Sequence, residues 1–304
     1  MGKNKKFKKL LIYSSAIAPM IFWGISYIWT KIVLQYYEPL TTIFLRLIIS
    51  TIFLSTVIFF KKINKIKKSD LKYFFLLAFF EPFCYFLGEN FGMKLISPTV
   101  ASIIISTIPV ITPIFAFIIL KEKLSKLNIL GLIISFTGVV LILTTKNSDL
   151  VVNFKGIMLL FLAAVSGVGY GITVRNLSNR YSPLTIVLTQ NFIGTIYFLP
   201  LFLIFEFKDF ISVTPNKELI FSILQLSIFA STLSFIFITY AIKNLGISKT
   251  NVFTNLIPIV TAIFSFFMLG KILTSQEIFG IIVVISGLFL SQKKKNAAVI
   301  HEDL

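Results

Sequence analysis

The chain has 304 residues, of which 56% are hydrophobic and 13% are charged, and its formal net charge is +17. An average soluble domain carries about 25% charged residues, so this composition excludes an ordinary soluble protein and predicts a membrane protein. Most lysines lie in short segments between apolar runs, and no polar stretch combines a basic face with aromatic residues, which argues against a nucleic-acid partner.

The apolar runs have the length that a membrane-spanning helix needs, about 20 residues. Helices also satisfy their own backbone hydrogen bonds inside the lipid bilayer. The first run is too long for a signal peptide and lacks a cleavage site of small residues, so we expect it to be retained. We therefore predict an all-α polytopic protein with ten spans, at about 12–34, 40–60, 72–93, 97–120, 127–145, 156–175, 183–205, 219–242, 247–270 and 275–291.

The distribution of basic residues predicts the orientation of these spans. If the N-terminus is cytoplasmic, the segments on that side hold 21 Lys and Arg residues and those on the other side hold 6. Lys31 and Arg46 lie within spans. Cytoplasmic loops are enriched in Lys and Arg, so we expect a multi-pass protein of the inner or plasma membrane with both termini in the cytoplasm.

The sequence at the end of the first half of the chain recurs near the end of the second half. Residues 108–141 and 257–290 share 13 identical residues over 34 aligned positions. The informative matches are those that constrain the backbone: Pro109 with Pro258, Gly131 with Gly280, and Gly138 with Gly287. A second match, of residues 38–41 with 182–185, places the start of the repeat. Each copy has five spans, and an odd number inverts the second copy in the membrane. We predict two inverted repeats, 12–145 and 156–291.

The third predicted span is unusual because two carboxyl groups interrupt its apolar sequence. Glu81, Tyr85, Gly88, Glu89 and Gly92 fall on one stripe of a helix. A carboxylate in mid-membrane costs about 2.5–3.5 kcal/mol on insertion scales, so both acids are expected to face a cavity. There they would bind a cationic group or carry a proton. The alternative is a structural ion pair of either acid, with the partner drawn from Lys31, Arg46 and Lys94.

Arg46 and several aromatic residues are further candidates for substrate contact. The planar guanidinium of Arg46 could bind a substrate carboxylate, or it could neutralise a glutamate of the third span. Aromatic residues could stack on a substrate, namely Trp23, Tyr27 and Trp29 of the first span with Tyr170 and Tyr240, and Tyr85 of the stripe is a further substrate-binding candidate. Aromatic residues of membrane helices nevertheless more often pack or anchor at the interface.

Polar residues and prolines inside other spans complete the candidate set. Ser106 and Asn255 occupy equivalent positions, three residues before Pro109 and Pro258. Together with Gln190 they either line the cavity or form hydrogen bonds between helices. The two prolines can bend their helices, either as hinges of a moving part or as static kinks.

The motifs of enzymes and metal proteins do not occur in the sequence. The single histidine, His301, lies in the polar C-terminal tail, and the single cysteine, Cys84, lies in an apolar run. Neither a metal-ligand spacing nor a phosphate-binding loop is found. We expect no metal, no cofactor and no catalytic residue.

The order of these motifs resembles the drug/metabolite transporter superfamily, and within it the ten-helix EamA-type family. The resemblance covers about residues 12–291 and is carried by Trp23-Gly24, Pro39 with Arg46, Pro109 followed by Leu120-Lys121-Glu122, Pro258 and the paired glycines. One departure is Lys271, where the family often has an acidic residue. The resemblance implies a secondary transporter, often an exporter of amino acids or related metabolites, with a central cavity lined by both repeats.

We therefore predict alternating-access export of an amino-acid-like or small amphipathic metabolite, with protons as the candidate coupling ion. The lipid bilayer and the small-molecule substrate are the expected partners. The alternatives are an uncoupled facilitator or exchanger, a lipid-modifying membrane enzyme, and a membrane partner protein without transport activity.

Overall fold

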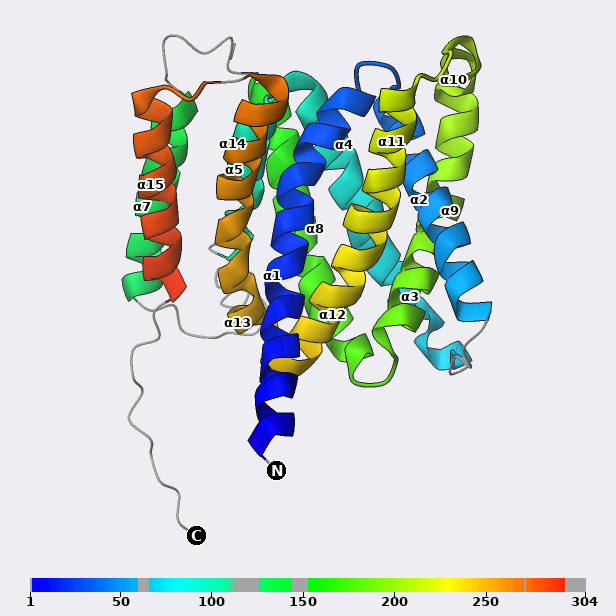
Figure 1. Cartoon of the computed structure of the whole chain (residues 1–304), viewed down its shortest axis with the longest axis horizontal. Coiled ribbons are helices and arrows are strands. Elements are labelled where there is room, and N and C mark those ends of the chain that lie inside the picture. Colours follow the sequence, from blue (N-terminus) through cyan, green and yellow to red (C-terminus); the bar gives the residue numbers. More distant parts are fainter. Residues whose placement is uncertain are drawn as a thin grey trace.

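The computed structural model describes residues 2–59, 66–109, 111, 126–143, 153–270 and 272–292, and within these ranges the chain is helical and contains no strand. The helices stand side by side in one bundle and run alternately up and down (Figure 1). The all-α fold class predicted from the sequence is thus confirmed. The elements of the first half are α1 (Gly2–Val33), α2 (Pro39–Phe59), η1 (Lys68–Asp70), α3 (Leu71–Ala78), η2 (Phe79–Cys84), α4 (Tyr85–Leu95), α5 (Pro98–Ile105) and α7 (Lys126–Leu143).

The second half begins at Asn153 and repeats the same alternation. Its elements are α8 (Phe154–Ser178), α9 (Pro183–Phe205), α10 (Phe207–Ser212), α11 (Lys217–Gln225), η3 (Leu226–Leu233), α12 (Ser234–Leu245), α13 (Ile247–Asn251), η4 (Val252–Asn255), α14 (Leu256–Leu269) and α15 (Ser275–Gln292).

Six helical segments are long and apolar enough to cross a membrane: Phe7–Val33, Pro39–Phe59, Lys68–Leu95, Phe154–Ser178, Pro183–Phe205 and Lys217–Leu245. They coincide with the first, second, third, sixth, seventh and eighth predicted spans. Shorter apolar helices occupy the fifth, ninth and tenth, and the fourth is described only up to Ile111. The rest of the fourth span, the Leu120-Lys121-Glu122 motif and Lys271 lie outside the described residues, so the count of ten stays a prediction.

The helix boundaries follow from residues with strong backbone preferences. Asn153, Ser182 and Asn216 each accept a hydrogen bond from a backbone N–H of the first helical turn, which caps α8, α9 and α11. At the other end, Gly246 and Gly270 stop α12 and α14 with φ values of 85° and 63°, a conformation that glycine adopts readily.

Sequence-related helices of the two halves pack against each other in opposite directions. In the α7/α15 pair, Gly138 lies against Val284, and Gly287 lies against Ser135. In the α2/α9 pair, Phe44 stacks on Phe202 with ring centroids 4.6 Å apart, and Thr51 lies 3.4 Å from Thr195 between their hydroxyl oxygens. Higher residue numbers on one helix meet lower numbers on the other in both pairs, which is the antiparallel relation that an inverted duplication requires.

The interruptions of the helices also recur at equivalent positions. A π-helical segment, η2 or η3, breaks the third long helix of each half, and a shift of 149 positions carries residues 79–84 onto 228–233, inside η3. Likewise, α5 ends just before Pro109, and η4 ends just before Pro258. Each proline lacks the N–H that would continue the hydrogen-bond ladder, which explains why the helix changes geometry on its N-terminal side.

Two buried carboxylates join the halves at opposite ends of the bundle. Glu206 follows α9 and accepts hydrogen bonds from the backbone N–H groups of Leu40 and Thr41, at 3.1 and 2.6 Å, so it caps α2. Asp70 accepts hydrogen bonds from Arg180 Nη1 at 2.5 Å and from the Tyr181 hydroxyl at 2.7 Å. Charge-assisted bonds of this kind are short and directional, and these two fix the register of each half against the other.

Close approach of α4 and α8 depends on a glycine. A Cβ atom added at Gly88 would lie 2.3 Å from the Leu159 carbonyl oxygen and 2.9 Å from the Ala163 nitrogen. We expect Gly88→Ala to lower the free energy of unfolding by about 1–3 kcal/mol, as overpacking does. Thermal unfolding of the purified protein in detergent measures this. The matched control is Gly171→Ala in α8, whose added Cβ would meet its nearest neighbour at 3.8 Å; equal melting temperatures of the two variants would contradict the prediction.

The orientation predicted from charge can be tested with two exposed serines at opposite ends of the bundle. Ser212 ends α10, and Ser69 lies in η1 (Figure 1). With Cys84 replaced by Ala, we expect Ser212→Cys to react with a membrane-impermeant maleimide in intact cells. Ser69→Cys should react only after the membrane is permeabilised. The reverse labelling pattern would place the termini on the outer side.

Candidate binding cavity

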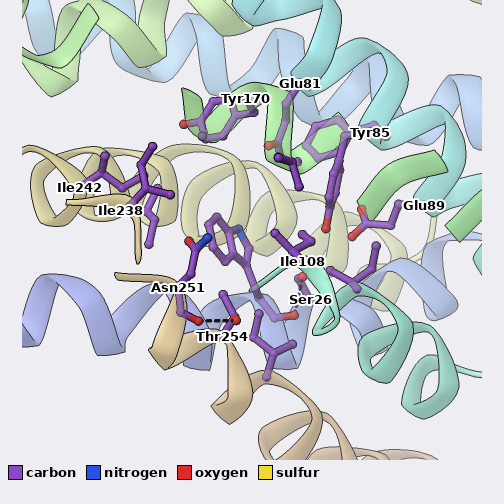
Figure 2. A pocket seen from close by; sticks show the side chains of 18 of the residues that line it. Ser26, Glu81, Tyr85, Glu89, Ile108, Tyr170, Ile238, Ile242, Asn251 and Thr254 are labelled. Carbon is purple, nitrogen blue, oxygen red and sulfur yellow. Dashed lines mark hydrogen bonds between the residues drawn. The ribbon is translucent and has the colours of Figure 1, made fainter. Parts of the chain in front are cut away.

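A cavity lies between helices of the two halves and has a volume of about 880 Å³, its mouth included. Figure 2 shows its wall, to which α1, α2, α4, α8, α12 and α13 all contribute side chains. The wall combines polar and aromatic side chains with seven isoleucines. The polar and aromatic side chains that line it are Trp23, Ser26, Tyr27, Arg46, Glu81, Tyr85, Phe86, Glu89, Tyr170, Asn251 and Thr254.

The break in the third long helix places its acids in this wall. Glu81 has extended backbone angles, φ −147° and ψ 118°, within the π-helical segment η2, and Pro82 follows it. The helix resumes at Tyr85, so both Tyr85 and Glu89 face the same cavity as Glu81 (Figure 2). Helix interruptions of this type occur frequently at functional sites.

The five residues of the stripe predicted on the third span divide between the cavity and a neighbouring helix. Glu81, Tyr85 and Glu89 line the cavity, whereas Gly88 and Gly92 pack against α8. The stripe is thus broad enough to contact the cavity along one edge and α8 along the other.

Arg46 is the cation of the cavity wall, and it is only 2% exposed. Its Nη1 lies 3.7 Å from Glu89 Oε2, and its Nε donates a hydrogen bond of 2.9 Å to Ser231 Oγ. Its guanidinium carbon lies 4.0 Å from the centre of the Phe86 ring, which adds a cation–π contact. The guanidinium is therefore held on three sides before any ligand enters.

Two phenol groups complete the surroundings of Glu89. The hydroxyls of Tyr27 and Tyr85 both lie close enough to the Glu89 carboxylate to interact with it, and Figure 2 shows the tips of Tyr85 and Glu89 side by side. Of the three basic residues considered as partners for the acids, Arg46 pairs with Glu89, while Lys94 pairs with Glu38 and Lys31 donates to the Met93 carbonyl.

A buried polar network stands behind Arg46. Asn191 Nδ2 donates to Ser50 Oγ at 2.7 Å and to the Ser231 carbonyl at 3.0 Å, and the hydroxyl oxygens of Ser50 and Thr232 are 2.5 Å apart. Inside a membrane such bonds between helices each stabilise by about 0.6 kcal/mol on average. These bonds also fix the position of Ser231, and thereby the direction in which the Arg46 guanidinium points.

Glu81 differs from Glu89 in having no such partners. Its side chain is buried, with 6% of the residue exposed, and it makes no hydrogen bond or ion pair with any residue that the structure describes. Figure 2 shows it on the same side of the cavity as Tyr170 and Tyr85. The described cavity wall thus holds two carboxyl groups and one cation.

The other predicted residues divide between the cavity and the surrounding packing. Trp23 lines the cavity, and its indole N–H donates to the Ala230 carbonyl at 3.2 Å, so its ring is fixed in place. Ser106, Gln190 and Asn255 are buried but do not line the cavity. Ser106 donates to the Ile103 carbonyl at 2.7 Å. The side-chain amides of Gln190 and Asn255 have no hydrogen-bond partner among the described residues.

Pro109 and Pro258 are both buried, and each comes directly after a helix interruption. Their role as hinges stays a prediction. The sequence reasoning missed Ser26, Ser231, Asn251 and Thr254. The only signal for them was that they are polar residues inside predicted apolar spans.

Comparisons with known proteins agree with this architecture. A sequence profile described as the EamA-like transporter family matches residues 10–144 and 154–292. The chain is 28% identical to an uncharacterized transporter of Archaeoglobus fulgidus over 90% of this chain and 96% of that protein. It is 27% identical to the uncharacterized transporter YyaM of Bacillus subtilis, over 92% and 93% of the two chains. A solved crystal structure superposes with a TM-score of 0.65 at 13% identity, over 90% of this chain and 97% of the other, which shows a shared fold.

The ion pair between Arg46 and Glu89 can be tested without knowing a ligand. Arg46→Met leaves Glu89 buried without its cation, and we expect a loss of about 3–5 kcal/mol in the free energy of unfolding. Adding Glu89→Gln should recover part of that loss. The control is Lys94→Met at the exposed pair with Glu38, which should cost less than about 1 kcal/mol. Additive effects of the two cavity substitutions in thermal unfolding would show that Arg46 and Glu89 are not coupled.

Proposed function

The chain belongs to the EamA-like transporter family, and from this premise we propose that it is a secondary transporter that exports an amino-acid-like or small amphipathic metabolite by alternating access. The observation that carries the proposal is the cavity enclosed by both halves, with Glu81, Arg46 and Glu89 in its wall. Intramembrane ionisable residues that face a cavity commonly serve transport.

The arrangement of the halves supports the alternation. In transporters built from inverted repeats, the substrate site lies near the midplane between the repeats, and rocking of one repeat against the other exposes it to each side in turn. Here the cavity reaches toward the end of the bundle where α1 begins, because Ile247 and Asn251 of α13 line it. With a cytoplasmic N-terminus, this is a state open toward the cytoplasm. We place the protein in the inner or plasma membrane.

Glu81 and Glu89 are the proposed carriers of a coupling proton. They are the acids of the described cavity wall, and both contact the space that a substrate would enter. A proton and a substrate that use the same carboxyl group cannot occupy it together, so their exchange would couple proton entry to substrate exit.

Transport can be tested in two steps. A metabolite export screen on cells with and without the protein identifies a leading compound. Its flux is then measured in proteoliposomes across a pH step. We expect the gradient to drive accumulation with the natural protein. The Glu81→Gln, Glu89→Gln double variant should lose at least about tenfold of that accumulation, equivalent to about 1.4 kcal/mol in driving force.

The control for this assay is Glu218→Gln, an exposed acid outside the cavity, which should behave like the natural protein. Proton coupling that persists in the double variant would exclude both acids as carriers. If flux through the natural protein does not change with the pH gradient or with uncouplers, the protein is instead a facilitator or exchanger.

A further inference from the structure

We propose that the cavity selects amphipathic amines that carry one positive charge and no carboxylate, with the ammonium group beside Glu81 and the apolar body against the isoleucine wall. This inference rests on the proposed transport function and narrows its substrate class. It follows from the unequal surroundings of the three charged groups in the cavity.

Arg46 is poorly placed to receive a substrate carboxylate. Glu89, Ser231 and the Phe86 ring lie on three sides of its guanidinium, and Nη1, which makes no hydrogen bond with the described residues, faces Glu89 at 3.7 Å. A second carboxylate at Nη1 would sit next to Glu89, in a region of low dielectric where like charges repel strongly. An anionic or zwitterionic ligand would therefore have to displace Glu89 from Arg46 and from the nearby Tyr27 and Tyr85 hydroxyls.

Glu81 has the opposite character, since it lacks any partner that would have to be displaced. It is buried, it lines the cavity, and no hydrogen bond or ion pair reaches it from the part of the chain that the structure describes. A carboxylate without a counter-ion in such a place is unfavourable, and an ammonium group would relieve that cost. Tyr85 and Tyr170 flank it in Figure 2, and aromatic faces favour a desolvated cation.

The remaining wall fits the rest of such a molecule. Seven isoleucines line the cavity: Ile105, Ile108, Ile172, Ile238, Ile242, Ile247 and Ile257. In Figure 2, Ile238 and Ile242 lie on the side away from Glu89, whereas Ile108 lies close to Tyr85. The isoleucines offer an uncharged apolar surface, beside which Asn251 and Thr254 add neutral polar groups. Binding sites of this kind take their specificity from a few polar groups and their affinity from apolar contact.

The test uses three compounds that share one phenyl body and differ in charge: 2-phenylethylamine, phenylalanine and 3-phenylpropionate. Their binding to the purified full-length protein in detergent is measured at pH 7.4 by titration calorimetry. We expect the amine to bind at least about tenfold more tightly than the zwitterion and the anion, which corresponds to about 1.4 kcal/mol. Glu81→Gln should weaken amine binding by a similar factor, while Glu218→Gln should leave it unchanged.

The order of binding affinities of the natural protein for the three compounds is a result that does not depend on any variant. Thermal unfolding without ligand shows whether Glu81→Gln is folded. Equal or tighter binding of phenylalanine, amine binding that is insensitive to Glu81→Gln in a folded variant, or no binding of the amine would each overturn the proposal. Transport of a zwitterion found in the export screen would leave the transport function intact and remove only the amine assignment, so the two failures are distinguishable.

Discussion

The contact between Arg46 and Glu89 is the interaction on which the centre of the molecule depends. Both groups lie in helices that cross an apolar environment, and neither could remain charged there alone without a large cost. Their pairing at 3.7 Å joins α2 to α4, and the bond from Arg46 to Ser231 joins both to η3 of the second half. The polar network of Ser50, Asn191 and Thr232 lies behind this pair and bonds to the Ser231 carbonyl through Asn191. These polar contacts hold the helices together on one side of the cavity. Among the described residues they do not extend across its middle, so the space there stays open.

Glycine residues allow the helices around this centre to pack closely. Gly88 and Gly92 let α4 approach α8, and Gly138 and Gly287 let α7 approach α15. Lipid is as apolar as leucine, so the hydrophobic effect does not drive these helices together, and contact between their backbones has to do so. The helix interruption η2 has a complementary effect, since it brings Glu81 into the cavity wall, and Ser231 of the second interruption, η3, accepts the hydrogen bond from Arg46.

The sequence was sufficient for the helical fold and for the charged part of the site, for an identifiable reason. Charges in apolar runs and repeated Pro and Gly residues are rare enough to carry information, so Arg46, Glu81 and Glu89 were predicted together and do line one cavity. Gln190 and Asn255 were also predicted to be candidates, yet they are buried away from it. A membrane helix is apolar on its lipid face as well as on its packed face, so hydrophobic periodicity cannot say which way a polar residue points. The π-helical segments add a change of helix geometry; Pro82 is a sequence signal for the first of them, whereas η3 contains no proline and had no such signal.

The duplication explains how a nearly symmetric scaffold can hold an asymmetric site. The positions equivalent to Glu81 and Glu89 in the second half are Ala230 and Ile238, and the position equivalent to Arg46 is Gln190. The first half therefore supplies the charges, whereas the second half supplies apolar wall, including Ile238 itself. Because Arg46 and Glu89 belong to the same half, they would stay next to each other while the halves rock, and the bond from Arg46 to Ser231 is the one that would have to break. In the proposed cycle the charged group thus travels as a unit with one half, and the change in access comes from the apolar wall of the other half moving past it.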